Sequence, residues 1–332
     1  MHLPKFEYLE PGEIGEAASI LEKYRGQCSI IAGGTDLLVA MKQRRKTPKY
    51  VISLAKVSKL KQIREEAGMI YIGPLATLEE VVASGHIQRR LPMLAQAAWE
   101  VGSPLLRTVA TIGGNICLDT RCRFYNQSEF WRGARPDCCK AGGVICHVTN
   151  KENTCYSTFS GDIAPALIAL NAQIQLIGDG DERWLPLAQF YTGIGRAPNL
   201  LAAGDNDILA GIKVPVPADG TKGLYRKYRF RESIDFPLVG LAALLRVDPG
   251  DGTCQEARLV FSGVGSRPVE ASEAENSLIG KKLNGGIIAA AAEAAAGEVH
   301  PVKTDRVSPR FKKKIVKAMV GESFAELGGV KS

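Results

Sequence analysis

Cysteines crowd one short stretch of this sequence. Five of the eight cysteines fall between positions 122 and 155, and the stretch has neither a helical nor a strand period. A long structureless loop inside a compact domain usually has a functional reason. Thiolates that close around a metal ion or an iron–sulfur cluster would be such a reason. The five candidates are Cys122, Cys138, Cys139, Cys146 and Cys155.

The spacing of these cysteines leaves their chemistry open. The loop lacks the Cys-x-x-Cys pair of most structural zinc sites, which favours an iron–sulfur cluster without excluding zinc or unligated thiols. Cys138 and Cys139 are adjacent, so either could be a ligand. His147 is a further candidate, although four thiolates are available without it. Of the other cysteines, Cys28 and Cys117 lie in or beside apolar strands, where a small buried hydrophobic side chain is expected.

Two glycine pairs could bind an anion. Gly33-Gly34 follows an apolar strand and precedes a helical run, and Gly113-Gly114 ends a β-branched run at 108–112 that we expect to be extended. Glycine allows close approach of the backbone to a ligand, and a helix N-terminus favours phosphate. Neither pair belongs to a Gly-x-Gly-x-x-Gly dinucleotide fingerprint. Tight connections and a grip on the two ends of a diphosphate therefore both fit the pattern.

The periodicity of the rest of the chain predicts an α+β fold in three parts. The first part is a small α/β unit at 1–55. The second spans 56–217 and contains the cysteine loop as an insertion at about 118–160. The third, at 218–332, has three antiparallel strands followed by helices. The expected strands are 27–32, 50–54, 69–72, 172–177, 208–214, 224–230, 238–247 and 257–264. The expected helices are 13–24, 37–41, 92–101, 162–170, 269–278, 287–296 and 309–320, and a capping box at 77–80 predicts the start of a further short helix.

Composition and charge exclude several classes of protein. A hydrophobic fraction of 45% and a charged fraction of 23% are ordinary for a soluble globular protein. Phe311, Ile315 and Met319 occur at helical spacing in and just after the basic run at 310–317. The lysines of the run, Lys312 included, are therefore expected on the solvent side of a helix rather than on nucleic acid. No secretory or membrane-spanning segment is apparent. We therefore expect a cytoplasmic protein with reduced thiols.

Four motifs in order resemble the FAD-binding subunits of the xanthine dehydrogenase and carbon monoxide dehydrogenase family. They are IIAGGTDLL at 30–38, ATIGGNIC at 110–117, GDIAPAL at 161–167 and YRKYRFRESIDFPLVGLA at 225–242. The resemblance spans nearly the whole chain. It implies a two-part FAD-binding domain of the vanillyl-alcohol-oxidase (PCMH) type, followed by a C-terminal α+β domain of the carbon monoxide dehydrogenase flavoprotein type.

The resemblance also implies which residues bind FAD. The first glycine turn would hold the diphosphate, Asp162 would reach the cofactor, and Leu209, Lys227 and Val101 would line the flavin. Without the resemblance, Leu209 and Val101 would be assigned to the core, Asp162 to a helix N-cap and Lys227 to an exposed strand position. The implied set is Ile30, Ile31, Ala32, Gly33, Gly34, Thr35, Asp36, Leu37, Val101, Thr111, Gly113, Gly114, Asn115, Asp162, Leu209 and Lys227.

The cysteine loop has its own resemblance within this family. The sequence CRFYNQSEFWR with four cysteines resembles the insertion in the β subunits of 4-hydroxybenzoyl-CoA reductases, which carries a [4Fe–4S] cluster. Most other members run directly from the second glycine turn into the helix at Asp162. The resemblance implies cluster ligands at Cys122, Cys138, Cys146 and Cys155 and leaves Cys139 outside the set.

The implied function is electron transfer within a molybdenum enzyme that reductively dehydroxylates 4-hydroxybenzoyl-CoA to benzoyl-CoA. Its partners would be a large molybdenum-cofactor subunit, a small subunit with two [2Fe–2S] clusters and a ferredoxin-type electron donor. One alternative is a related hydroxylase subunit that acts oxidatively on another aromatic or heterocyclic substrate. A second alternative is a zinc-stapled binding module without a redox role.

Overall fold

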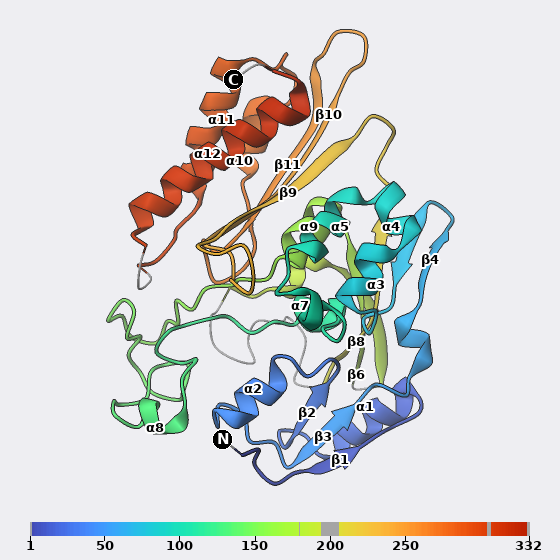
Figure 1. Ribbon diagram of the computed structural model, residues 1–332, viewed down its shortest axis with the longest axis vertical. Helices are drawn as coiled ribbons and strands as arrows, with labels where there is room; N and C mark the ends of the chain where they lie inside the picture. Colours follow the sequence, from blue (N-terminus) through green and yellow to red (C-terminus); the bar gives the residue numbers. More distant parts are fainter. Residues whose placement is uncertain (1, 179, 194–205, 304–306, 331–332) are drawn as a thin grey trace.

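A computed structural model of the chain describes residues 2–178, 180–193, 206–303 and 307–330. The backbone is organised around three β-sheets, each with its own helices and buried core (Figure 1). The expected α+β class is confirmed. None of the helices in the described ranges combines the length and apolar character needed to cross a membrane.

The N-terminal sheet is parallel, with the strand order β1-β3-β2. The apolar stripe of helix α1, which includes Ala17 and Leu21, packs on Ile52 of the central strand. After β2 the chain passes through Gly33-Gly34 into α2, so the expected strand, glycine turn and helix are all present. The elements of this part are β1 (Glu7–Leu9), α1 (Ile14–Lys23), β2 (Cys28–Ile31), α2 (Leu37–Lys42) and β3 (Tyr50–Ser53).

The middle sheet is antiparallel, with the order β4-β5-β8-β6-β7. One helix that covers it, α3, begins with a complete capping box in which Thr77 and Glu80 bond each other's backbone amides, as the sequence predicts. The strands are β4 (Ile63–Glu66), β5 (Met69–Ile72), β6 (Gln173–Gly178), β7 (Asp181–Pro186) and β8 (Ile208–Pro215). The helical elements are η1 (Ser58–Lys61), α3 (Leu78–Ala83), α4 (Gly85–Arg90), α5 (Pro92–Trp99), α6 (Pro104–Arg107), α7 (Ile112–Ile116), α9 (Ile163–Ala169) and η2 (Leu187–Phe190).

The expectation of an extended run at 108–112 that ends in a glycine turn is wrong. Thr111 is the N-cap of helix α7, and its Oγ1 accepts a hydrogen bond from the Gly114 amide at 3.1 Å. Gly113 and Gly114 therefore lie inside a short helix. A threonine cap at this position outweighs the β preference of the branched residues before it.

The C-terminal sheet, of order β12-β11-β10-β9, is covered on both faces. Along β10, Leu241 and Leu245 face the C-terminal helices, whereas Ala242 and Leu244 belong to the core of the middle sheet. Burial of both faces explains why this strand is a continuous apolar run. The elements are β9 (Lys222–Tyr228), β10 (Val239–Val247), β11 (Cys254–Ser262), β12 (Val269–Glu270), α10 (Ser272–Leu278), α11 (Gly285–Glu298) and α12 (Pro309–Gly328).

One lysine of the basic run does not point to solvent. Lys312 on α12 is buried, and its ammonium donates to the carbonyl oxygen of Gly263 at 2.6 Å. Ile315 and Met319 are buried as predicted, while Phe311 is partly exposed. The four-residue spacing predicted the helix correctly but not the full width of its buried face.

The cysteine insertion forms a separate lobe beside α2, drawn in green in Figure 1. Its only helix in the described ranges is α8 (Glu129–Arg132), and isolated bridges such as Arg121 with Thr158 close the loop. Arg132 fastens the lobe to the N-terminal part, because its guanidinium donates to the carbonyl oxygens of Gln43 and Arg44. The absence of a regular period in the sequence thus corresponds to an irregular structure.

Candidate functional site

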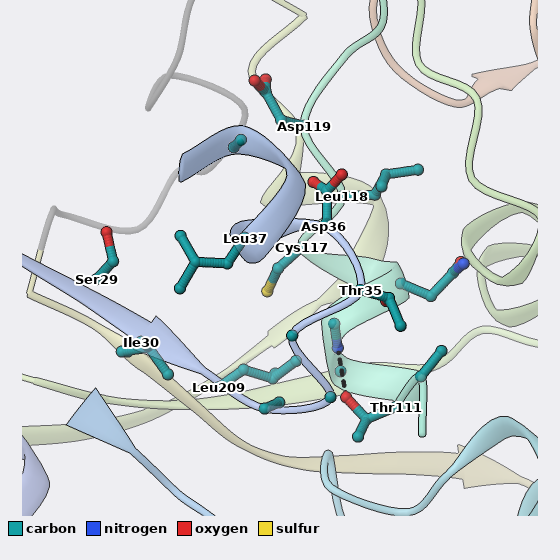
Figure 2. A pocket seen from close by; sticks show the side chains of 18 of the residues that line it. Ser29, Ile30, Thr35, Asp36, Leu37, Thr111, Cys117, Leu118, Asp119 and Leu209 are labelled. Carbon is teal, nitrogen blue, oxygen red and sulfur yellow. Dashed lines mark hydrogen bonds between the residues drawn. The ribbon is translucent and has the colours of Figure 1, made fainter. Parts of the chain in front are cut away.

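A cavity of about 680 Å³ lies where the N-terminal part, the middle part and the C-terminal sheet meet. Side chains from both glycine regions surround the same space: Thr35, Asp36 and Leu37 come from the first and Thr111 from the second (Figure 2). The volume is within the range of cofactor sites. The cavity is therefore the candidate binding site of the fold.

The residues implied by the family resemblance converge on this cavity, with two exceptions. Ile31 does not line the cavity, and neither does Lys227, which hydrogen-bonds to the lining residue Asp162. The implied residues that line the cavity are Ile30, Ala32, Gly33, Gly34, Thr35, Asp36, Leu37, Val101, Thr111, Gly113, Gly114, Asn115, Asp162 and Leu209.

The glycines around the cavity serve different purposes. A Cβ atom on Gly33 would overlap the carbonyl oxygen of Val109, so this glycine lets the two glycine regions touch. A Cβ on Gly113 would overlap Pro74. A Cβ on Gly114 would meet only the Thr111 Oγ1, at 3.1 Å, and Gly114 is exposed to the cavity. Gly33 and Gly113 therefore allow packing, whereas Gly114 leaves room for a ligand.

Two arginines give the cavity an anion-binding character. Arg121 pairs with the carboxylate of Asp36, and Arg45 donates to the side chain of Gln43. Each keeps one buried guanidinium nitrogen without a hydrogen-bond partner, Nη2 in Arg45 and Nε in Arg121. Burial lowers the pKa of Arg45, because the charged form loses its hydration. Unpaired buried donors of this kind fit an anionic ligand such as a diphosphate.

Sequence reasoning did not single out either arginine as a ligand-binding residue. Arg45 stands in a run of basic residues typical of a solvated surface, and Arg121 directly precedes Cys122. Only the fold brings both residues to the cavity, since one comes from the end of α2 and the other from the insertion.

Asp162 lies at the centre of a buried polar network. Its carboxylate accepts from the Lys227 ammonium at 3.0 Å and from the Tyr225 hydroxyl at 2.7 Å. Lys227 also donates to the carbonyl oxygen of Glu100. Burial raises the pKa of the Asp162 carboxyl, and Lys227 and Tyr225 oppose this rise. Asp162 precedes helix α9 but makes no capping hydrogen bond, because its oxygens are used by these two partners.

Lys227 is thus a support for Asp162 rather than a lining residue. Its side chain is 1% exposed, and a buried ammonium needs acceptors on several sides. The strand pattern could not show this, because Lys227 lies on β9 of the C-terminal sheet and Asp162 belongs to the middle part.

A strained loop from the C-terminal sheet completes the cavity wall. Ile234 has a φ of 65°, which is rare for a β-branched residue, and its amide donates to the Gly102 carbonyl at 3.0 Å. The neighbouring Phe236 ring lies 4.6 Å from the Arg121 guanidinium carbon. Ile234 and Phe236 both line the cavity. The sequence motif covered this loop but gave no role to its residues.

The five cysteines of the insertion gather in one place. Cys139, Cys146 and Cys155 form a small buried cluster, whereas Cys122 and Cys138 are half-buried beside it. The Cys139 thiol is hydrogen-bonded to Cys155, and the neighbouring Cys155 and Cys138 add to the rise that burial causes in the pKa of Cys122. The structure thus brings all five together, Cys139 included.

Backbone amides point at two of the sulfur atoms. At Cys146 burial acts to raise the thiol pKa, but amides of residues 148, 149 and 156 donate to the sulfur and the net pKa is lowered. At Cys122 burial raises the pKa, and the amides of Phe124 and Tyr125 oppose it. Burial and the neighbouring thiols raise the pKa of Cys139 to about 12. Amide hydrogen bonds to sulfur favour thiolates, which are the form that binds metal.

The described residues hold no group of three or more histidine, cysteine, aspartate and glutamate side chains placed to bind a single metal ion. His147 is directed elsewhere, since its Nε2 lies 2.9 Å from the Pro136 carbonyl oxygen. Cys117, expected to be buried, is instead exposed and lines the cavity.

Comparisons with known proteins agree over nearly the whole chain. A family model described as the FAD binding domain in molybdopterin dehydrogenase matches residues 4–217, and one described as the CO dehydrogenase flavoprotein C-terminal domain matches residues 224–327. The carbon monoxide dehydrogenase medium chain of Hydrogenophaga pseudoflava is 28% identical over 318 residues, which is 96% of this chain and 95% of the relative.

Two further similarities support the same relationship. The aldehyde oxidoreductase FAD-binding subunit of Escherichia coli strain K12 is 31% identical over 281 residues, covering 82% of this chain and 86% of the relative. A solved structure of carbon monoxide dehydrogenase from Hydrogenophaga pseudoflava superposes with a TM-score of 0.81 at 27% identity, covering 98% of this chain and 97% of the other.

Proposed function

This chain belongs to the FAD-binding subunits of the xanthine and carbon monoxide dehydrogenase family of molybdenum enzymes, and we propose that it transfers electrons in a 4-hydroxybenzoyl-CoA reductase. In this proposal the complex removes the phenolic hydroxyl of 4-hydroxybenzoyl-CoA reductively and yields benzoyl-CoA. The chain would carry FAD in the cavity and a [4Fe–4S] cluster in the insertion.

The cavity supports the placement of FAD. Gly114 leaves open space at the start of α7, while the unpaired nitrogens of Arg45 and Arg121 offer donors for a diphosphate. Asp162, held by Tyr225 and Lys227, presents a fixed acceptor at the cavity wall. Bound there, FAD would supply one- and two-electron chemistry, and the chain's own residues would bind and orient it.

The single observation that carries the proposed cluster is the gathering of the thiols around buried amide donors. Four thiolates at Cys122, Cys138, Cys146 and Cys155 would be the ligands. The loop lacks the Cys-x-x-Cys pair that most structural zinc sites contain, which favours a cluster over zinc. Such a cluster would supply one-electron chemistry at low potential, which a demanding reduction requires.

The proposal requires partners. The candidate cluster cysteines of this chain all belong to one site, so the molybdenum cofactor and two [2Fe–2S] clusters would reside on a large and a small companion subunit. A reduced ferredoxin would deliver electrons at the insertion. A reducing cytoplasm would keep these thiols free of disulfides and available as ligands.

A second candidate function has some support. The relatives named above are a dehydrogenase and an oxidoreductase, which favours an oxidative reaction. The second candidate is therefore a hydroxylase subunit that serves the oxidation of another aromatic or heterocyclic substrate. Electron flow would then run in the opposite direction. The cysteine insertion is the feature that distinguishes the two candidates, because an oxidative enzyme has less need of a strong reductant at this position.

Anaerobic purification with the companion chains tests the proposal. We expect flavin, iron and sulfide in this chain, and turnover of 4-hydroxybenzoyl-CoA with reduced ferredoxin. A complex that oxidises a heterocycle and ignores this thioester would establish the second candidate. A colourless chain with bound zinc would refute both the cluster and the redox role of the insertion.

Two cysteine variants separate the ligand assignments. Cys138→Ser should lose the cluster signal, keep FAD and lose electron input from ferredoxin, whereas Cys139→Ser should keep all three. The reverse outcome would show that the fourth ligand is Cys139, which packs directly against Cys146 and Cys155.

A further inference from the structure

Lys140 carries a positive charge in the interior of the insertion. Its side chain is 1% exposed. The ammonium donates to the Asp119 carboxylate at 2.7 Å and to the carbonyl and hydroxyl oxygens of Thr120 at 3.0 and 2.5 Å. The ring of Tyr125 lies 5.1 Å away. Full use of the ammonium hydrogens fixes the charge in one position.

One side of Lys140 faces the cysteines. The Ser157 hydroxyl lies 3.5 Å from the Lys140 ammonium and 3.2 Å from the Cys155 sulfur. The same hydroxyl is hydrogen-bonded to Thr120 at 2.5 Å. Along the chain, Lys140 follows directly after the adjacent pair at 138–139. A single hydroxyl group therefore separates the ammonium from a candidate cluster ligand.

Lys140 does not line the cavity itself but is linked to it by an ion pair. Asp119, its ion-pair partner, lines the cavity, and Figure 2 shows its carboxylate among the lining side chains. Hydrogen-bonded groups thus run without interruption from Cys155 through Ser157 and Lys140 to Asp119. The chain joins the candidate cluster site to the wall of the candidate flavin site.

We propose that Lys140 is a positioning residue that sets the reduction potential of the [4Fe–4S] cluster; this inference rests on the proposed function. When the cluster passes one electron to FAD, the cluster is oxidised by one electron and the flavin is reduced by one. A fixed positive charge in a low-dielectric interior stabilises the more negative, reduced cluster. Lys140 would therefore hold the cluster potential up, closer to that of the flavin, and Asp119 would moderate this effect.

The test is a redox titration of the complex, followed by the electron paramagnetic resonance signal of the reduced cluster. Lys140→Met should lower the equilibrium constant for cluster reduction at least tenfold, which is about 59 mV for a one-electron couple. Lys140→Arg should restore most of the loss because it keeps the charge. Lys151→Met is the matched control: Lys151 is an exposed lysine of the same insertion, so water screens its charge and no shift is expected.

The outcomes separate this inference from its premise. A wild-type chain without iron would refute the proposed cluster. A wild-type chain with the cluster, together with a Lys140→Met variant that has full cluster and flavin content and an unchanged potential, would overturn the role of Lys140 alone. If Lys140→Met fails to assemble the cluster, Asp119→Asn decides: removal of the opposing charge should raise the cluster potential, and an unchanged or lower potential overturns the inference.

Discussion

Backbone geometry shapes the wall of the cavity, whereas side chains hold the cysteine insertion together. At the cavity, Gly33 meets the backbone at Val109 and Gly113 meets Pro74, so the wall follows from short, regular elements in contact. In the insertion the chain is irregular, and its contacts are made by side chains: a buried lysine, an arginine and five cysteines. Contacts of the first kind need only backbone and glycine, whereas the second kind depends on buried charges and thiols that need partners.

Substitutions at the glycines of the cavity wall should have the largest effects on flavin binding and stability. Gly114→Val should fold normally but weaken FAD binding at least about a hundredfold, because its side chain would occupy space that is open to the ligand. Bound flavin after gel filtration measures the effect. Full flavin content in this variant would contradict the placement of FAD.

Gly33→Ala provides the contrast within the same wall. Its methyl group would overlap a backbone oxygen, so we expect a loss of thermal stability of the whole chain as well as of flavin. Gly12→Val, at a position with open space around it, is the control and should change neither property.

If the insertion holds the proposed cluster, removal of its iron should affect the insertion but not the three sheets. An iron chelator applied under oxidising conditions should expose amides throughout 118–160 to hydrogen exchange, while the three sheets and the bound flavin stay protected. Hydrogen-exchange mass spectrometry reports both regions at once. Release of flavin together with iron would indicate that the cluster stabilises the whole fold rather than the insertion.

Lys312 is a buried lysine that lies outside the cavity, so its charge should affect the stability of the fold rather than ligand binding. Burial lowers the pKa of its ammonium from 10.5 to about 8. Between pH 8 and 10.5 the unfolded state binds more protons than the folded state, so the free energy of unfolding should rise with pH. Below pH 8 the folded state bears the full cost of the buried charge.

Lys312→Met should abolish this rise, which amounts to about 3 kcal/mol across the window. Urea denaturation at several pH values measures it. Lys314→Met, on the exposed face of the same helix, should keep the wild-type slope. An unchanged slope in Lys312→Met would show that another group titrates in this range.

The smallest effect is expected where the insertion docks on the N-terminal part. Arg132→Ala removes hydrogen bonds to the carbonyl oxygens of Gln43 and Arg44, at 3.2 and 3.0 Å. We expect a loss of about 1–2 kcal/mol in local stability, seen as faster hydrogen exchange in the insertion with flavin retained. Lys151→Ala, on the exposed side of the insertion, should not accelerate exchange.

Sequence patterns predicted the elements of this fold better than their contacts. The strands and helices with a clear period were found near their predicted positions, whereas the three-residue strand β1 was missed because it is too short to show a period. At 108–112 the β-branched composition predicted an extended segment, which is wrong. Thr111 instead caps the N-terminus of α7.

The sequence by itself determined which atoms could do chemistry here. Glycines that admit a ligand and thiols that bind metal are properties of residue types, and they can be recognised in order along the chain. Only the tertiary structure decided that Arg45 and Arg121 share one cavity, that Lys227 supports Asp162, and that Lys140 lies between the cysteines and the cavity. The physical reason is that a buried charge is stable only beside acceptors from distant segments, and no local pattern records which segments will meet.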